Sequence, residues 1–197
     1  MLRHIAAALS PRAPMRRTTT LLRLCAGCLL AVGASLTQAA DWRPDGVVLE
    51  AGVGRNGNKL LGAGLSWDWK FHHLTRAAEL SARTELLLNE WWVDDIGGGH
   101  RGFTQLVLLP TLRMQMAQGR SPWFFELGIG ASYMDPLYVT PDKQFSTRFN
   151  FYDVLGVGYR LGQDRELGLR LNHVSNGGIK NPNPGEEFVQ LRFLQRF

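Results

Sequence analysis

Apolar and polar residues alternate along most of this chain, from residue 46 to the last residue. Successive side chains of a β-strand point to opposite faces, so this period of two predicts strands with one apolar and one polar face, whereas an amphipathic helix would repeat every 3.6 residues. Most of the alternating windows are about as long as a tilted strand needs to cross a bilayer. There are eight of them, near residues 47–53, 61–70, 80–89, 105–116, 123–133, 148–160, 167–172 and 189–197.

The first 40 residues carry a different pattern. Basic residues that include Arg16, Arg17 and Arg23 precede a short apolar run at residues 24–36, and small residues follow at 37–40. This order predicts a secretory signal peptide over residues 1–40, with Met15 as an alternative start, and it leaves residues 41–197 as the mature domain. The apolar run is short for a transmembrane helix.

Removing that segment changes both the charge and the cysteine content. The chain has 22 basic and 17 acidic residues, but five of the basic residues and none of the acidic ones lie in residues 1–40, so the mature domain is formally neutral. The basic balance therefore gives no reason to expect nucleic acid as a partner. Cys25 and Cys28 also lie there, and their spacing leaves a redox pair, a metal pair or a lipoprotein processing box open. The mature domain has no cysteine.

Alternation alone fits a soluble sandwich as well as a membrane barrel. The predicted signal peptide favours the barrel, and so does the final amphipathic strand, whose terminal Phe197 resembles an outer-membrane assembly signal. Aromatic residues also gather near the strand ends, as they do at membrane interfaces; they are Trp67, Trp69, Trp91, Trp92, Trp123 and Tyr159. We therefore predict an all-β fold, an eight-stranded antiparallel transmembrane β-barrel, and keep the soluble sandwich as the alternative.

The interior of an eight-stranded barrel is just wide enough to be filled by side chains. The polar faces carry charges of both signs, which we expect to pair in the interior rather than to line a pore; they are Glu50, Asp68, Arg83, Glu85, Arg113, Glu126, Arg148, Arg160, Arg170 and Arg192. With both termini in the periplasm, the connections near residues 55–58, 93–101, 134–145 and 176–186 would face outward.

A histidine and a serine continue the apolar face of the seventh window. Leu169 and Leu171 lie on that face, and the same parity reaches His173 and Ser175. Polar side chains at lipid-facing positions are costly unless they bond to each other or perform chemistry. The pair is therefore a candidate site on the outside of the barrel, where it would meet outer-leaflet lipid.

A carboxylate approaches this pair from the eighth strand. Glu187 shares the parity of the apolar face, and Glu186 has the opposite parity. In a roughly symmetric hairpin Glu187 would lie opposite Ser175, with His173 as a diagonal neighbour. Ser175 would then be the nucleophile, His173 its general base and Glu187 the group that orients the imidazole.

The residues after the serine suit an oxyanion hole. Asn176, Gly177 and Gly178 follow it directly, and glycines allow backbone N–H groups to turn toward a developing negative charge. The Asn176 amide would be a further donor. We see no sequence pattern for a metal or an organic cofactor, although Asp94 and Asp95 leave a small opening for calcium.

The stretch His173-Val174-Ser175-Asn176-Gly177, followed by Asn183 and Glu187, resembles the C-terminal motif of PagL-type lipid A 3-O-deacylases. The resemblance is close over residues 170–197 and loose over the rest of the mature chain. It implies hydrolysis of the 3-O-linked hydroxyacyl ester of lipid A in lipopolysaccharide, in the outer membrane and without a cofactor. It also implies a role for each motif residue: His173, Ser175 and Glu187 as the triad, Asn176 with the glycine amides of Gly177 and Gly178 as the oxyanion hole, and Asn183 as loop support.

Other functions stay open at this stage. An outer-membrane phospholipase or acyltransferase could use the same triad, and a non-enzymatic adhesin or structural barrel would act through its loop at residues 134–145. His173 and Ser175 could also be interfacial polar residues without chemistry. His72, His73 and His100 fit solvated turns and loops, and Gly97-Gly98-Gly99 fits a flexible connection. The sequence does not decide between a monomer and a homodimer.

Overall fold

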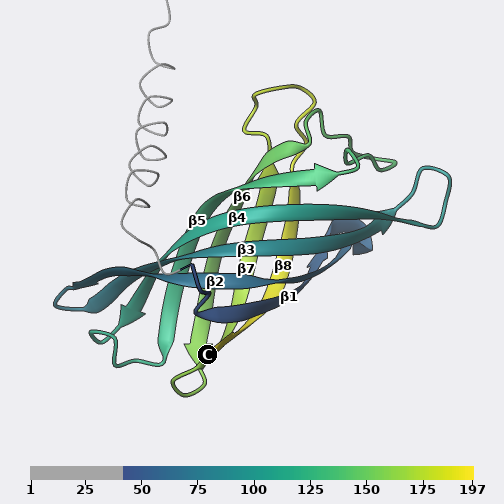
Figure 1. Ribbon diagram of the computed structural model, residues 1–197. Helices are drawn as coiled ribbons and strands as arrows, with labels where there is room; N and C mark the ends of the chain where they lie inside the picture. The colour runs from purple at the N-terminus through teal and green to yellow at the C-terminus, as the bar shows by residue number, and fades with distance from the viewer. Residues whose placement is uncertain (1–41) are drawn as a thin grey trace, which may run out of the picture. The chain divides into compact units, whose positions relative to one another are not determined.

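The computed structural model describes residues 42–197, and the predicted signal peptide with Cys25 and Cys28 lies outside the described residues. The described chain forms eight antiparallel strands that close into a barrel (Figure 1), which confirms the predicted fold class. The strands are β1 (Gly46–Gly54), β2 (Lys59–Leu74), β3 (Ala78–Asp94), β4 (His100–Met116), β5 (Trp123–Asp135), β6 (Phe149–Arg160), β7 (Arg165–Ser175) and β8 (Glu186–Arg196). A short 3-10 helix, η2 (Arg55–Gly57), joins β1 to β2.

Each strand pairs with the next one in sequence, and β8 closes the barrel against β1. This last pairing runs from Gly46 opposite Arg196 to Gly54 opposite Phe188. Closure gives every strand two neighbours and leaves no strand at an open sheet edge, as a strand structure surrounded by lipid requires.

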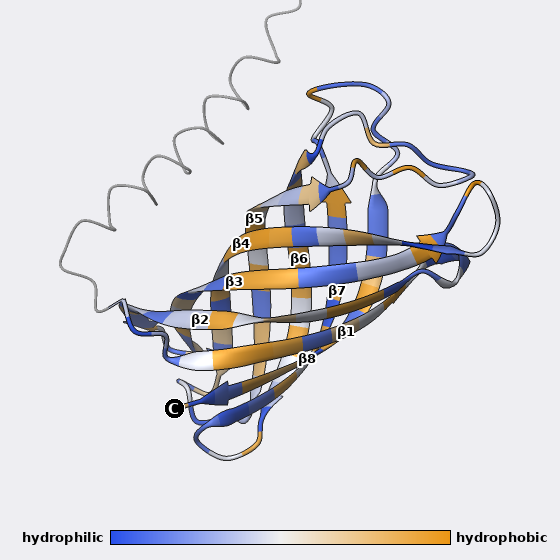
Figure 2. Ribbon diagram, turned by 45° about the vertical axis from the view of Figure 1, so that its right-hand side comes forward, coloured by the Kyte–Doolittle hydropathy of each residue, from blue (hydrophilic) through white to orange (hydrophobic). Residues whose placement is uncertain are grey.

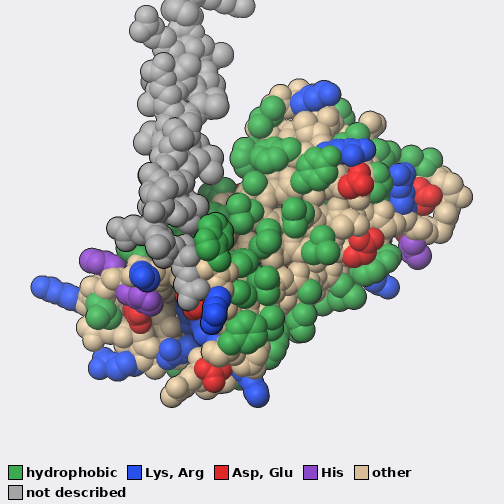
Figure 3. Space-filling view, in the orientation of Figure 1, with side chains coloured by type: hydrophobic (Ala, Val, Ile, Leu, Met, Phe, Trp, Pro, Cys, Tyr) green, Lys and Arg blue, Asp and Glu red, His purple; other side chains and the backbone are tan. Residues whose placement is uncertain are grey.

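The outer face of the barrel is apolar. Large side chains such as Leu61, Leu108, Leu127, Leu155 and Leu169 are each more than half exposed. Hydrophobic and hydrophilic residues alternate along the strands (Figure 2), and hydrophobic side chains cover much of the face shown in Figure 3. So large an exposed apolar surface is expected for a barrel that lipid surrounds. No helix within residues 42–197 is both long enough and apolar enough to span a membrane.

The two ends of the barrel differ. The end that carries Gly46 and Arg196 has the short connections 75–77, 117–122 and 161–164, and we call it the terminus end. The opposite end, the loop end, has the connections 55–58, 95–99, 136–148 and 176–185. The two longest of these, 136–148 and 176–185, join β5 to β6 and β7 to β8. The longest connections of the described chain therefore lie on this side of the loop end.

Paired charges fill the half of the interior near the terminus end. Glu85 accepts two hydrogen bonds from Arg170 at 2.8 and 3.1 Å and also bonds to Arg192. Glu166, which the sequence prediction missed, accepts hydrogen bonds from four guanidinium groups, those of Arg83, Arg113, Arg192 and Arg196. The predicted filling of the interior by ion pairs is confirmed for most of the named residues. Arg148 and Arg160 are exceptions, because Arg148 precedes β6 and is exposed beside Asp135, and the Arg160 guanidinium donates to the carbonyl oxygen of Gly119.

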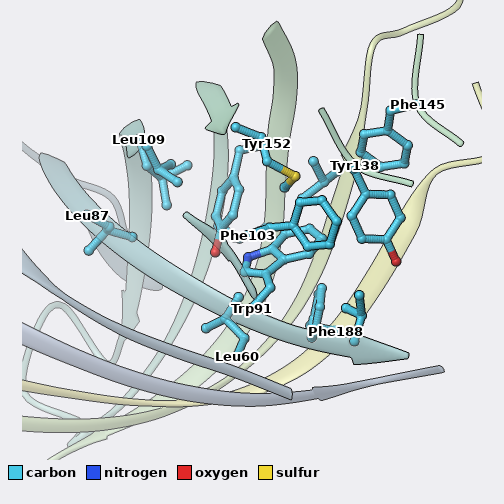
Figure 4. Close-up of a cluster of buried hydrophobic side chains, with 14 of the residues drawn as sticks. Leu60, Leu87, Trp91, Phe103, Leu109, Tyr138, Phe145, Tyr152 and Phe188 are labelled. Atoms are coloured by element: carbon cyan, nitrogen blue, oxygen red, sulfur yellow. The ribbon is translucent and has the colours of Figure 1, made fainter. Parts of the chain in front are cut away.

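Aromatic side chains fill the interior at the loop end (Figure 4). Trp91 packs edge-to-face against Phe188 at a ring-centroid distance of 4.6 Å, and Tyr138 packs on Phe145 at 4.7 Å. The prediction that Trp91 belongs to an interfacial belt is therefore wrong. Alternation places it on the inner face next to outward-facing Trp92, and the side chain is fully buried. The connection 136–148 supplies Tyr138 and Phe145, so it folds inward over the mouth of the barrel.

Candidate active site

His173 and Glu187 lie side by side on the outer face near the loop end. His173 on β7 is the direct cross-strand partner of Glu187 on β8. Nδ1 of the imidazole lies 3.0 Å from Oε1 of the carboxylate. Both side chains are partly open to the surroundings, with exposures of 43% and 41%. A neutral imidazole that donates from Nδ1 to this carboxylate keeps Nε2 unprotonated, as a general base requires.

The predicted hairpin register is wrong by two residues. We expected Glu187 opposite Ser175, but it lies opposite His173. The predicted outward face of Glu187 is nevertheless confirmed, because a register shift of two residues preserves strand parity. Val189 pairs with Leu171 on β7 and with Val53 on β1, so the offset of the hairpin must also agree with the pairing that closes the barrel. The sequence of one hairpin does not contain that second constraint.

Ser175 ends β7 two residues beyond His173 and pairs with Phe151 on β6. It is only 8% exposed, unlike the leucines of the same strand face. Its Oγ accepts a hydrogen bond from the N–H of Gly177 at 3.4 Å. No hydrogen bond joins Ser175 to His173 among the contacts of the described residues, and such a bond is often loose in the absence of substrate.

Gly185 holds the imidazole from the loop side. Its backbone has φ +68°, and a Cβ built there would lie 2.8 Å from Cε1 and 3.5 Å from Nε2 of His173. The pairing of β7 with β8 ends at Val174 and Glu186, so Gly185 directly precedes the last paired residue of β8. The imidazole thus lies against the backbone that leads into β8.

The backbone after Ser175 is held by two asparagines. The N–H of Asn176 donates to Oδ1 of Asn183 at 2.9 Å, and the N–H of Gly178 donates to Oδ1 of Asn176 at 2.9 Å. The Asn176 amide nitrogen donates to Oγ of Ser146 and to the carbonyl of Lys180. Of the donors proposed for an oxyanion hole, the N–H of Gly177 is thus the one that points at Ser175 Oγ, and the others brace the loop.

A second carboxylate flanks His173 from the other side. Asp153 on β6 is the direct cross-strand partner of His173, so the imidazole lies between Asp153 and Glu187. Sequence reasoning missed Asp153, although its parity is that of the outward-facing Phe151 and Leu155, because it considered only the last hairpin. Within residues 42–197 no group of three or more histidine and carboxylate side chains is arranged to hold a metal ion.

The sequence of this chain matches a protein family over the region that contains these residues. Residues 61–195, about two thirds of the chain, match the model of the family described as lipid A 3-O-deacylase (PagL). The chain belongs to this family. The matched region runs from β2 through nearly all of β8, so it contains each of the residues around His173 described above.

Individual relatives in the lipid A 3-O-deacylase family match most of the chain. The lipid A deacylase PagL of Bordetella bronchiseptica is 31% identical over 169 residues, which are 83% of this chain and 90% of the relative. The enzyme of the same name from Pseudomonas aeruginosa is 30% identical over 166 residues, with the same shares covered. A crystal structure of the outer membrane enzyme PagL superimposes with a TM-score of 0.68 at 26% identity and covers 77% of this chain and 99% of that one.

Proposed function

We propose that this lipid A deacylase hydrolyses the 3-O-linked hydroxyacyl ester of lipid A with Ser175 as nucleophile, His173 as general base and Glu187 as the orienting acid. The ester-hydrolase activity belongs to the family, and the assignment of roles to residues is our proposal. The observation that carries it is the contact of 3.0 Å between His173 Nδ1 and Glu187 Oε1 on the outer face, on the strand that carries Ser175 two residues further on.

The position of the site supports the choice of substrate. His173 and Glu187 stand on the apolar outer face at its loop end, where a lipid headgroup region would meet the barrel. The family and the barrel fold support an outer-membrane location. With the terminus end in the periplasm, the site faces the outer leaflet, which consists of lipopolysaccharide, so the ester reaches the serine without leaving the membrane.

The proposed reaction begins with attack of Ser175 Oγ on the ester carbonyl carbon while Nε2 of His173 takes the hydroxyl proton. Glu187 accepts the hydrogen bond from Nδ1 and stabilises the imidazolium that forms. Negative charge develops on the carbonyl oxygen, and the N–H of Gly177, which lies 3.4 Å from Ser175 Oγ, is the donor we assign to that charge. Collapse of the tetrahedral intermediate breaks the bond to the sugar 3-oxygen, which takes the proton back from His173.

The second half of the reaction regenerates the serine. Water attacks the acyl-enzyme and transfers a proton to His173, and the imidazole returns that proton to Ser175 Oγ. The products are a free hydroxy fatty acid and lipid A with a free 3-hydroxyl group. Each proton has an acceptor in the pair His173 and Glu187, so the cycle balances with residues of this chain and one water molecule.

Mass spectrometry of lipid A tests the proposal. Cells that express the protein should contain lipid A that lacks one hydroxyacyl chain, and purified folded protein should release the free acid from lipopolysaccharide in detergent micelles. Ser175→Ala and His173→Ala should each lower kcat by roughly 10⁴-fold or more, because nucleophile and base act as a unit.

Folding of each variant is checked by the heat-modifiable gel mobility of the barrel. An unchanged lipid A profile in cells with folded wild-type protein would contradict the proposed activity. Full activity of Ser175→Ala would contradict the assigned nucleophile and leave the activity itself in place.

A further inference from the structure

The connection 136–148 contacts the segment that leads to Glu187. Lys143 donates from Nζ to the carbonyl oxygen of Gly185 at 2.9 Å and to Oε2 of Glu186 at 2.8 Å. These are the two residues directly before Glu187. One ammonium group from the β5–β6 connection therefore ties down the start of β8.

The first of these bonds reaches the imidazole through the backbone. Gly185 is buried, and the space beside its Cα is taken by the ring of His173. A displacement of this residue would open room for the ring to turn away from Glu187. The bond from Lys143 to its carbonyl oxygen opposes that displacement.

The second bond compensates a buried charge. The Glu186 side chain is 1% exposed and points into the barrel, while its neighbour Glu187 points outward. It accepts hydrogen bonds from Asn58 Nδ2 at 3.1 Å and from the Tyr138 hydroxyl at 3.3 Å. Among the ion pairs of the described residues, Lys143 is its one cationic partner. Burial and the charge of Glu186 raise the pKa of Tyr138, so that hydroxyl keeps its proton and remains a donor.

The lysine itself stands on an anchored turn. Its N–H donates to Thr140 Oγ1 at 3.1 Å, and its carbonyl accepts from the Thr140 N–H at 2.8 Å. Next to it, Asp142 accepts a hydrogen bond from Asn56 Nδ2 at 2.8 Å. The rings on either side of the turn, those of Tyr138 and Phe145, pack against each other in the mouth of the barrel (Figure 4). The turn that carries Lys143 is thus anchored independently of the contacts that its ammonium group makes with β8.

We propose that Lys143 is a positioning residue for the deacylation reaction. Its ammonium group bonds to Gly185 and Glu186, so we assign it no contact with the reacting atoms. It holds Gly185 and Glu186, and through them keeps Glu187 within hydrogen-bond distance of His173 and keeps Gly185 packed against the imidazole ring. This inference rests on the proposed triad, since it assigns to Lys143 the support of two triad members.

The test compares Lys143→Met with Lys143→Arg in the purified full-length barrel, with lipopolysaccharide in mixed micelles as substrate. We expect kcat to fall roughly 10- to 100-fold in Lys143→Met, the range for a lost support of a catalytic group, with KM within about twofold. Lys143→Arg keeps a charged donor and should recover most of kcat. The rate at which a small fluorophosphonate labels Ser175 should fall in parallel, because labelling needs the base but not the lipid.

A double variant separates positioning from charge compensation. Lys143→Met combined with Glu186→Gln leaves no unpaired carboxylate at position 186, so we expect it to fold even if the single variant does not. We expect it to remain as slow as Lys143→Met in kcat and in labelling, because the bond to Gly185 is still missing. Full activity of the double variant would overturn the inference, since Lys143 would then act only by neutralising Glu186.

Lys70→Met is the matched control, because Lys70 is an exposed lysine on β2 toward the terminus end and should leave kcat unchanged. Wild-type kcat and labelling in folded Lys143→Met, with Ser175→Ala inactive, would overturn the role of Lys143 and leave the triad standing. Activity in Ser175→Ala would overturn the triad, and the role of Lys143 with it.

Discussion

The barrel carries two histidine–glutamate pairs of nearly equal geometry, one toward each end. Toward the terminus end, Nδ1 of His72 lies 2.9 Å from Oε1 of Glu79, and near the loop end the corresponding distance between His173 and Glu187 is 3.0 Å. His72 even has a serine, Ser81, as its cross-strand partner. Residue types and a single distance therefore do not distinguish the two pairs.

The surroundings distinguish them. The His72 side chain is 58% exposed in a segment where the strand register shifts. At the loop end, Gly185 packs against the imidazole and the N–H of Gly177 points at Ser175 Oγ. The connections 136–148 and 176–185 bond to each other around this pair through Ser146 and Lys143. The candidate site is therefore characterised by a hydrogen-bonded frame with an N–H donor, and not by the histidine–carboxylate contact alone.

Removal of the two carboxylates should give the largest contrast. Glu187→Ala should lower kcat about 100-fold, which is about 2.7 kcal/mol of transition-state stabilisation, and should leave more activity than Ser175→Ala because the orienting acid is the most dispensable triad member. Glu79→Ala removes the same group from the other pair and should leave kcat unchanged. Release of hydroxy fatty acid from lipopolysaccharide measures both.

Equal losses in Glu187→Ala and Glu79→Ala, with both variants folded, would contradict the comparison. A larger loss in Glu79→Ala would move the candidate site to the terminus end. The heat-modifiable gel mobility of each variant shows whether the barrel is folded, so that a loss of activity through unfolding is not mistaken for a loss of catalysis.

The frame itself is tested by adding one methyl group. Gly185→Ala should lower kcat roughly 10-fold, because a misplaced catalytic group loses its alignment. The new Cβ would lie 2.8 Å from the His173 ring, and the residue would keep a φ of +68°, which is strained for any residue with a Cβ. Fluorophosphonate labelling of Ser175 should slow by the same factor.

Gly98→Ala is the matched control for this change. Gly98 has φ +85° in the β3–β4 connection, with nothing within 4 Å of a built Cβ, so the variant carries the backbone strain without the contact to an imidazole. An equal loss of kcat in both variants would assign the effect to strain alone and would remove Gly185 from the frame.

The strands and the lipid-facing side of the site could be predicted from the sequence, because a period of two carries both. Parity placed His173 and Glu187 on one face even though the predicted register was off by two residues. Parity also implies that Trp91 and Trp92 face opposite sides, and the prediction overlooked this when it assigned both to the membrane interface.

Contacts between loops could not be predicted. Lys143 lies 43 positions from Glu186 and Ser146 lies 30 positions from Asn176, and both belong to a connection without strand periodicity. Their contacts depend on the packing of Tyr138 and Phe145, which belong to the same connection, in the mouth of the barrel. Strand parity could have placed Asp153 on the outer face. Its pairing with His173 could not be predicted, because it depends on the register between β6 and β7.

Asp153 gives the smallest and most specific expected effect. It flanks His173 on β6 as Glu187 does on β8, but the hydrogen bond from Nδ1 goes to Glu187. A partly buried charge without that bond contributes little to the orientation of the ring, so Asp153→Asn should change kcat by about threefold or less, under about 1 kcal/mol. In a Glu187→Ala background Asp153 becomes the one carboxylate beside the imidazole, and Asp153→Asn should then cost more than it does alone. Steady-state kinetics of the two single variants and the double variant measure this coupling. Strict additivity would mean that Asp153 never substitutes for Glu187, and a larger loss from Asp153→Asn than from Glu187→Ala would make Asp153 the orienting acid.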